Sequence, residues 1–458
     1  ELEKKNYGQE MPAILSELPA MTYSSDTGLA NGYTYVSMRG VPPTRINFTL
    51  DGAPLNEPED STLYFVDFAD LAASTESLQV QRGVGTSAAG VASFVGSVNF
   101  ASLDLKESAE GTARLSLGSF GAEGVSASYQ TGRLGTSGLK AYVRGTWQST
   151  DGFRDNSAID QESVYAGLSH ESEKGYFKLF GFVGREKSQS AYYAVEPWIL
   201  DEDIRYNPLT PDEKDSFGQQ FVEAQYTRFL SETSSLAAQL YVNDAGGWYR
   251  LKSSDGSELR EYGLDWTNLG AAVTYKAALG PVGLTWGVHG SDFGSDRTRD
   301  VVGGERSWAN RGYKSEASTF VKLARDAGPW HLYADAQLRW ARFRYEGDVD
   351  LGSISWTFLN PKLGVRRDVG RDLSFYASVG ATSREPGRGD LLYGEENASS
   401  WHDLHDVKPE RVVAFELGSS FRAGPFAAQV NLYDMEFEDE SALTGEQSEV
   451  GLAIRRNA

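Results

Sequence analysis

The stretch Trp330-His331-Leu332-Tyr333-Ala334-Asp335-Ala336-Gln337-Leu338-Arg339-Trp340 decides the fold of this chain. Every second residue is apolar, and the residues between them carry a charge, an amide, an imidazole or a phenol. A period of two with one polar and one apolar face predicts a β-strand with water on one side only. The same period recurs at residues 139–148, 375–382 and 426–433, so the pattern continues over most of the chain.

The segments that join these strands alternate between short and long. The short ones include 118–124, 231–234 and 422–425, and the long ones include 188–219, 252–260, 290–313 and 385–408. Tight turns at one rim and long loops at the other are typical of an antiparallel β-barrel in an outer membrane. We therefore expect an apolar face toward lipid, a polar face toward a lumen, and Trp147, Trp286 and Trp340 at the membrane interfaces. The alternative is a soluble β-protein with these aromatic residues in its core.

Composition excludes several classes of protein. The 458 residues contain 43 basic and 64 acidic side chains, a net charge of −21, which argues against nucleic acid as a partner. The chain has no Cys, so disulfides and thiolate chemistry are excluded. The charged start Glu1-Leu2-Glu3-Lys4-Lys5 is no signal peptide, and the uncharged run 83–103 has too much Gly and Ser for a membrane helix. No serine–histidine–acid arrangement is visible, so we expect no enzyme.

The first hundred residues follow a different pattern. A short helix is predicted over 11–19, with Pro12 near its start and Pro19 at its end. Short strands are predicted at 46–50, 77–81 and 95–100, with turns such as Asp51-Gly52 between them. These elements predict a small α+β module ahead of the strands.

Motifs in this module resemble those of a known family. Residues 6–15 with Leu18-Pro19, Met38-Arg39-Gly40, and residues 47–56, 77–87 and 96–100 resemble the plug domain of TonB-dependent outer-membrane receptors. Residues 383–386, 407–410, 416–418 and 443–445 resemble barrel segments of the same family, of the siderophore and iron-complex type. The resemblance implies a plug over 1–104 inside the lumen of a transmembrane antiparallel β-barrel over 110–458. The family barrel has about 22 strands and we count about fifteen, so we expect the N-terminal TonB box and C-terminal strands to be missing here.

The resemblance also implies a function and partners. It implies active import of a scarce large ligand, a ferric siderophore or other iron complex, energised by the TonB–ExbB–ExbD complex. Import of cobalamin or an oligosaccharide, or a glycan-binding surface barrel that does not transport, are the alternatives. A surface lipoprotein is a further candidate partner beside outer-membrane lipid. No resident cofactor is expected, because ferric ion would enter only as part of the ligand.

Four charged residues are predicted to hold the plug in the barrel. The resemblance places Glu410 and Glu416 on the barrel wall, where they could pair with Arg39 and Arg82 of the plug. An arginine buried in a lumen needs such a partner, because an unpaired buried charge costs several kcal/mol. The alternative is four solvated charges in a wet lumen.

Aromatic residues of the long segments are predicted to bind the ligand, because their flat faces give rigid contact area. The candidates are Tyr193, Trp198, Tyr206, Trp248, Tyr249, Trp308, Tyr313, Tyr393 and Trp401, together with Arg384. An anionic ferric complex would also need a basic lining, for which we name Arg384 with Arg205, Arg250, Arg311 and Arg388. The alternative is that these aromatic residues pack the loops together or lie at the membrane surface.

Two clusters are weak candidates for metal binding. His402 and His405 lie among the carboxylates of 401–406, and Asp201 and Asp203 flank Glu202 in a cluster that suits a hard cation such as Ca²⁺. A hydrated loop is the favoured interpretation for His402 and His405, because no strong helix brings them onto one face, and a solvated loop is also favoured for the acidic cluster.

Overall fold

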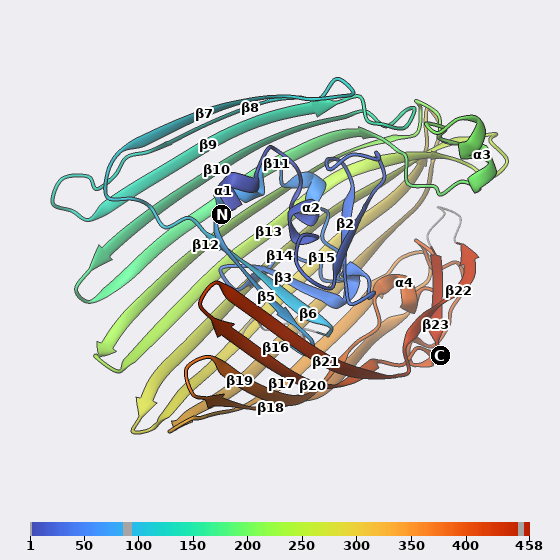
Figure 1. The fold of residues 1–458 in the computed structure, drawn as a ribbon. Coiled ribbons are helices and arrows are strands. Elements are labelled where there is room, and N and C mark those ends of the chain that lie inside the picture. Colours follow the sequence, from blue (N-terminus) through green and yellow to red (C-terminus); the bar gives the residue numbers. More distant parts are fainter. Residues whose placement is uncertain (1, 86–93, 448–452) are drawn as a thin grey trace.

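The computed structural model describes residues 2–85, 94–447 and 453–458. A large curved sheet encloses a smaller N-terminal body on its concave side (Figure 1). We call the smaller body, residues 2–102, the plug and the large sheet the wall. Positions 86–93 of the uncharged run fall outside the described residues, and no helix within the described ones is long and apolar enough to cross a membrane.

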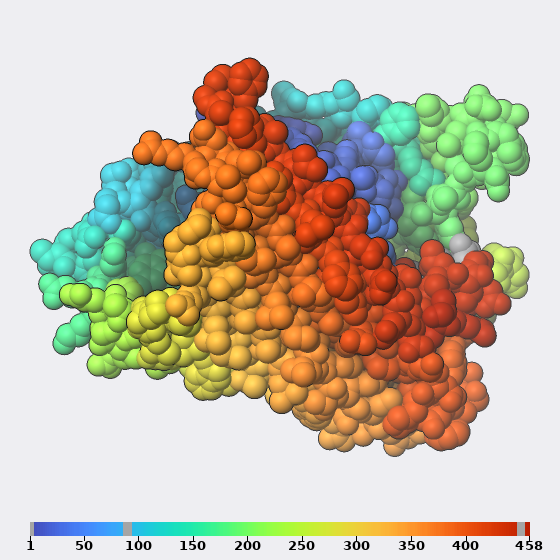
Figure 2. All heavy atoms as spheres, turned by 60° about the horizontal axis from the view of Figure 1, so that its bottom comes forward, coloured from blue at the N-terminus to red at the C-terminus, as the bar shows by residue number. Residues whose placement is uncertain are grey.

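The wall contains fifteen strands in the part of the chain that the structure describes. Each strand pairs antiparallel with the next in sequence order, and β7 and β21 form its two outer edges. The strands are β7 Glu110–Leu117, β8 Glu123–Gln130, β9 Leu139–Thr150, β10 Ile159–Ser172, β11 Gly175–Gln189, β12 Lys214–Ser231, β13 Ser234–Lys252, β14 Leu259–Leu279, β15 Val282–Val301, β16 Arg306–Ala327, β17 Trp330–Glu346, β18 Gly352–Val369, β19 Leu373–Arg384, β20 Glu410–Ala423 and β21 Phe426–Glu438. Figure 2 shows the plug atoms, in blue, between the C-terminal strands and the green part of the wall.

The wall is apolar outside and mostly polar inside, the reverse of a soluble protein, and aromatic residues of its inner face pack on the plug. In β17, Leu338 and Trp340 are 51% and 38% exposed, whereas Gln337 and Arg339 are 1% and 2% exposed. Exposed large apolar side chains along successive strands form a surface that suits lipid rather than water. The alternation predicted from the sequence therefore divides a lipid-facing side from a side that faces the plug.

The long connections lie at one rim, but not all of them are where the sequence predicts. The segment 190–213 joins β11 to β12 and carries α3 Pro197–Glu202, and 385–409 carries α4 Arg388–Leu391 and η5 Leu404–Asp406. The prediction of a long loop at 290–313 is wrong, because β15 and β16 continue to Val301 and from Arg306. The tight turn 118–122, which joins β7 to β8, lies at the same rim as the long loops, because every second connection of the antiparallel sheet returns to that rim. A short hairpin, β22 Ser441–Gln447 with β23 Ala453–Asn457, follows the wall.

The plug is a small sheet with short helical turns. Its elements are α1 Leu2–Lys5, α2 Met11–Leu15, β1 Met21–Ser25, β2 Thr34–Met38, η1 Pro43–Arg45, β3 Ile46–Leu50, β4 Ala53–Pro54, η2 Phe65–Asp67, η3 Leu71–Ser74, β5 Thr75–Arg82 and β6 Gly96–Ser102. The central sheet has the order β4-β3-β6-β5, with β3 and β6 parallel. Helix α2 ends at Leu15, before the predicted end at 19. The N–H groups of Glu17 and Leu18 donate to the carbonyls three residues earlier instead of four, and Pro19 disfavours helical backbone in the residue before it.

The core of the plug continues into the wall. Phe48, Phe65 and Phe100 pack together inside the plug, and Phe68 lies 4.8 Å from Phe182 of β11, centroid to centroid. Phe182 in turn stacks on Phe221 of β12 at 5.8 Å. The same apolar cluster therefore stabilises the plug and fixes its position against β10–β13.

Candidate functional site

Arg39 connects the plug to the C-terminal side of the wall. Its guanidinium lies 2.6 Å from the carboxylate of Glu416 on β20, with side-chain exposures of 1% and 14%. It also lies 3.9 Å from the ring centroid of Tyr433 on β21. Arg39 adopts a left-handed φ of 54°, followed by Gly40 at 78°, and this turn after β2 directs the side chain to the wall. The structure thus brings together Arg39 and Glu416, two of the four predicted contact residues.

Glu410 is paired with two arginines, neither of which is Arg82. Arg45 of η1 donates to Glu410 and also to the carbonyl of Ser441 at 3.0 Å. Arg384, at the end of β19, approaches Glu410 at 3.0 Å from its Nε. Arg82 instead donates to the carbonyl of Pro19 at 2.7 Å, in an exposed bond within the plug. Arg45, which was not among the four predicted contact residues, therefore pairs with Glu410, and it lacks the following Gly that singled out Arg39 and Arg82.

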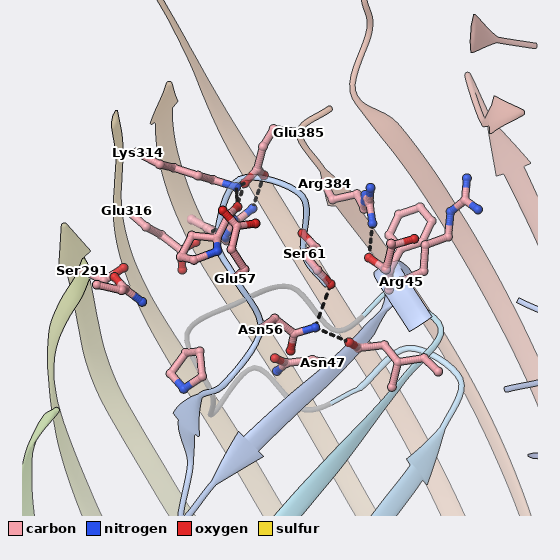
Figure 3. Close-up of a pocket in the computed structure, with 17 residues that line it drawn as sticks. Arg45, Asn47, Asn56, Glu57, Ser61, Ser291, Lys314, Glu316, Arg384 and Glu385 are labelled. Carbon is pink, nitrogen blue, oxygen red and sulfur yellow. Dashed lines mark hydrogen bonds and ion pairs between the residues drawn. The ribbon is translucent and has the colours of Figure 1, made fainter. Parts of the chain in front are cut away.

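A second group of ion pairs lies beneath the plug segment 54–61. Lys314, Glu316 and Glu385 converge there around a small polar cavity of about 50 Å³ (Figure 3). Arg339 contacts both Glu316 and Glu385 at 2.6 Å, and Lys314 lies 2.7 Å from Glu385. Burial alone would raise the pKa of Glu385, but Arg339 and Lys314 hold that pKa well below its usual range. Lys314 also donates to the carbonyl of Pro58, which connects this wall cluster to the plug.

Further ion pairs distribute the plug's attachment around the lumen. Asp70 pairs with Arg114 of β7, and its carbonyl accepts from Arg144 of β9 at 2.6 Å. Glu59 lies 3.1 Å from Arg297 of β15 and 3.6 Å from Arg388 of α4. These pairs contact wall segments far apart in the sheet, so the plug is held on several sides at once.

A cavity of about 300 Å³ lies between the plug and the wall near the long-loop rim. The plug contributes parts of residues 26–35 and 55–67, and the wall contributes the rim ends of β12 to β15. Its lining includes Asp26, Tyr33, Tyr35, Leu55, Glu57, Asp60, Tyr64, Asp67, Tyr192, Asp215, Phe217, Gln219, Tyr249, Trp266, Arg297 and Glu396. Aromatic faces with a few polar groups are the usual composition of a small-molecule site.

Of the predicted ligand-binding aromatic residues, Tyr249 lines this cavity. Trp248 is its neighbour on β13 and points to the opposite face of the strand, where Arg250 lies over its ring at 4.6 Å. Trp308 is buried against Tyr262 and Leu251. The expectation that Trp248, Tyr249, Trp308 and Tyr313 are loop residues is wrong, because β13 and β16 continue through them.

The remaining aromatic candidates lie in the long loops, outside the lining described for the cavity. Trp198 on α3 and Trp401 are 63% and 68% exposed. Tyr193 packs on Tyr192 at 4.6 Å, and Tyr393 packs on the ring of His402 at 4.8 Å. The carbonyl of Tyr206 accepts from Arg154.

The arginines proposed as a basic lining are engaged elsewhere. Within the described residues, the 300 Å³ cavity contains none of the five. The pairs are Arg205 with Asp155 at 3.6 Å, Arg250 with Glu261 at 2.7 Å, Arg311 with Asp296 at 2.6 Å, Arg384 with Glu410 at 3.0 Å and Arg388 with Glu59 at 3.6 Å. The structure therefore gives the cavity no basic lining from these side chains.

The candidate metal ligands are also dispersed. His402 contacts the carbonyl of Leu391 at 2.9 Å, and His405 contacts the carboxylate of Asp403 at 2.8 Å. Asp201 lies in the exposed helix α3, and Asp203 follows it and accepts from the N–H of Arg205. No group of three or more His, Asp or Glu side chains that could hold a metal ion occurs in the part of the chain that the structure describes.

The acidic residues of the cavity are not among the residues predicted from the sequence. Asp26 and Asp67 come from the plug, and Asp215 comes from the rim end of β12. Burial raises the pKa of Asp26 to about 7, although a hydrogen bond from Tyr35 and the charge of Arg154 oppose the shift. These residues are scattered in the sequence among many exposed acids, and no local pattern marks them.

A sheet that is apolar outside and holds its own N-terminal domain inside defines the class of plugged transport barrels. Family models place the chain within that class. The model described as "TonB dependent receptor-like, beta-barrel" matches residues 106–453, and "TonB-dependent Receptor Plug Domain" matches residues 1–97. The chain therefore belongs to the TonB-dependent receptor family. A search of curated proteins gives no match.

Solved structures share this fold at low sequence identity. The unliganded ferric citrate transporter FecA is 13% identical, with a TM-score of 0.78 over 98% of this chain and 71% of that one. The copper transporter OprC is 15% identical, with a TM-score of 0.79 over 94% of this chain and 69% of that one. The FrpB iron transporter from Neisseria meningitidis is 18% identical, with a TM-score of 0.71 over 99% and 73%.

Family membership fixes the general activity. TonB-dependent receptors are transporters of the bacterial outer membrane and not enzymes, and their transport is energised through TonB. The outer face of the wall is therefore the lipid-facing surface, and the long-loop rim is the extracellular one. The 300 Å³ cavity, which is shared between plug and wall, lies toward that extracellular rim.

Proposed function

We propose that this receptor imports a ferric-iron complex, of the siderophore type, across the outer membrane. The observation that carries the proposal is the cavity that the plug and the wall line together. Iron transport is named for two of the structures with the same fold, the ferric citrate transporter and the FrpB iron transporter. A ligand held by aromatic residues of both the plug and the wall contacts the plug, which must move during transport, and the wall, which stays fixed.

The energy for uptake comes from outside the chain in this proposal. Ligand binding cannot by itself drive accumulation against a gradient, so the TonB–ExbB–ExbD complex supplies the work by pulling on the plug. The ion pairs of Arg39 and Arg45 with wall carboxylates resist that pull at rest. Cobalamin, an oligosaccharide, or surface glycan binding without transport are the competing functions, and a surface lipoprotein would be an accessory partner.

The test measures uptake of radiolabelled iron complexes by an iron-limited host that lacks its own receptors for them. We expect uptake when the receptor is expressed, and its loss when the gene for TonB is deleted. The matched variants are Tyr249→Ala, inside the cavity, and Trp248→Ala, its neighbour on the other face of β13. Tyr249→Ala should raise the apparent KM at least tenfold, and Trp248→Ala should leave it unchanged. Uptake of cobalamin or an oligosaccharide, with no iron complex taken up, would contradict the proposal.

A further inference from the structure

The cavity between plug and wall is strongly acidic. Six carboxylates and one guanidinium line it among the described residues. The carboxylates are those of Asp26, Glu57, Asp60, Asp67, Asp215 and Glu396, and the guanidinium is that of Arg297. The excess of acid is concentrated in one small space, unlike the solvated charges of the outer loops.

The single arginine does not balance the acids. Arg297 lies 3.1 Å from Glu59, 3.4 Å from Asp60 and 3.2 Å from Glu396, so its charge is already shared among several carboxylates. The carboxylate of Glu57 also lies 3.9 Å from the guanidinium of Arg297. The opposite side of the cavity, with Asp26, Asp67 and Asp215, has no guanidinium or ammonium in the lining described for it. Burial therefore raises the pKa of Asp67 well above its usual range, because no cation of the lining stabilises the ionised carboxylate, and a cationic ligand would lower that pKa again.

Asp67 is the least satisfied of the three acids on this side. The residue is 5% exposed, and its Oδ1 has no hydrogen-bond partner within the described part of the chain. Asp26, by contrast, accepts from Tyr35 at 3.2 Å, and Asp215 accepts from Tyr33 and Ser188. A buried carboxylate oxygen without a partner costs free energy that a bound donor would recover.

Aromatic rings also line the cavity. Tyr33 and Tyr35 of the plug donate to Asp215 and Asp26 on the acidic side, and Tyr64, Tyr249 and Trp266 complete the aromatic part of the lining. The negative faces of aromatic rings attract organic cations, and desolvation strengthens that attraction. Carboxylates framed by such rings recognise an ammonium group better than they recognise a bare metal ion, which needs three or more ligands in close array. Among the described residues, no such metal-binding group occurs.

We infer that the transported ligand carries an organic cation, an ammonium or a similar group, that enters this cavity beside Asp67. The inference rests on the proposed function for the iron complex and adds the charge of the ligand to it. A volume of about 300 Å³ suits a positively charged arm of a larger complex. The receptor is then selective against anionic complexes such as catecholates and citrates, and for hydroxamate-type complexes that end in a free amine.

The experiment compares two probes that differ only in charge. One is a linear ferric trihydroxamate with a terminal ammonium group, and the other is the same complex with that amine acetylated. Binding of both to the purified receptor in detergent is measured by titration, together with an iron-free alkylamine and its acetamide. We expect acetylation to weaken binding of the ferric complex at least tenfold. The alkylamine should bind and its acetamide should not.

Two variants test the assigned residue. Asp67→Asn keeps the size of the side chain and should remove most of the preference for the ammonium form. Asp212→Asn removes the same charge from an exposed position just before β12 and should keep the preference. Equal binding of the two ferric complexes to the unaltered receptor would overturn the inference, and so would a preference that survives Asp67→Asn. If the alkylamine binds in preference to its acetamide while no ferric complex binds, the proposed function fails and the cation site stands.

Discussion

Replacing Arg45 with Ala tests whether buried ion pairs hold the plug. Arg45 and Glu410 have side-chain exposures of 4% and 1%, so this pair lies away from water. Breaking a buried pair by removing one partner costs about 3–5 kcal/mol. Arg384 stays 3.0 Å from Glu410 in the variant, so the carboxylate keeps one partner. We therefore expect the lower limit, about 3 kcal/mol, which is roughly a hundredfold shift in the equilibrium between docked and undocked plug.

The assay is hydrogen exchange of the plug amides in β3 and β6, measured on the detergent-solubilised receptor. Arg45→Ala should accelerate this exchange by about a hundredfold if the plug opens as a unit. Glu410→Gln should have a larger effect, because it leaves Arg45 and Arg384 side by side without a carboxylate. Arg82→Ala is the matched control, since it removes an exposed bond within the plug and should cost less than about 0.5 kcal/mol.

The test depends on the order of the hydrogen-exchange rates in the three variants. Equal rates of amide hydrogen exchange in Arg45→Ala and Arg82→Ala would refute the reasoning, since a buried ion pair would then hold the plug no better than an exposed hydrogen bond. Faster exchange in Arg82→Ala than in Arg45→Ala would restore the assignment that the family resemblance suggested. Conductance of the receptor in a planar bilayer gives an independent measurement, because an undocked plug admits ions.

Three other predictions concern the cavity and the wall. Affinity for the ammonium-bearing complex should rise about tenfold from pH 6 to pH 8, because the pKa of Asp26 is about 7 and the ionised form attracts the cation. Gly184→Ala should displace the plug turn η2 and weaken ligand binding in titrations, because a Cβ there would collide with the carbonyl oxygen of Asp67. Overpacking of this kind costs about 1–3 kcal/mol. Leu338→Arg should destabilise the wall by about 2–4 kcal/mol in lipid, measured by equilibrium unfolding, since Leu338 faces outward in the apolar band.

Each of these has a contradicting result. Affinity that falls or stays flat from pH 6 to pH 8 would remove Asp26 from the binding site. Unchanged ligand affinity in Gly184→Ala would show that the position of η2 does not affect ligand binding. A Leu338→Arg variant as stable as the parent would place that residue outside the lipid-facing band, and Arg342→Lys, a charge-conserving change on the same face of β17, provides the control.

The alternation in β17 shows how much local pattern can predict. Leu338 and Gln337 fall on opposite faces in the sequence, and the structure exposes the first and buries the second. The pattern failed near the extracellular rim, where 290–313 was predicted as a loop. Strands β15 and β16 continue there with charged residues on both faces, because both faces meet polar surroundings beyond the bilayer. Period two is visible only where lipid and lumen differ in polarity.

The ion pairs show what local pattern leaves open. An arginine in the plug needs a carboxylate, and that much follows from its charge. Which arginine meets Glu410 depends on how the plug lies in the wall, and Arg45 is 365 residues distant from its partner. The Arg-Gly pattern favoured Arg82, which bonds within the plug instead.

The sequence by itself determined the class of fold. The alternation of polar and apolar residues and the plug motifs are local patterns, and they can be recognised without knowing any contact. Only the tertiary structure decided where charge gathers. Asp26, Asp67 and Asp215 meet because a plug loop, a plug turn and a wall strand converge on one cavity. Their chemistry comes from burial and mutual proximity, and both are properties of the packed chain rather than of any segment of it.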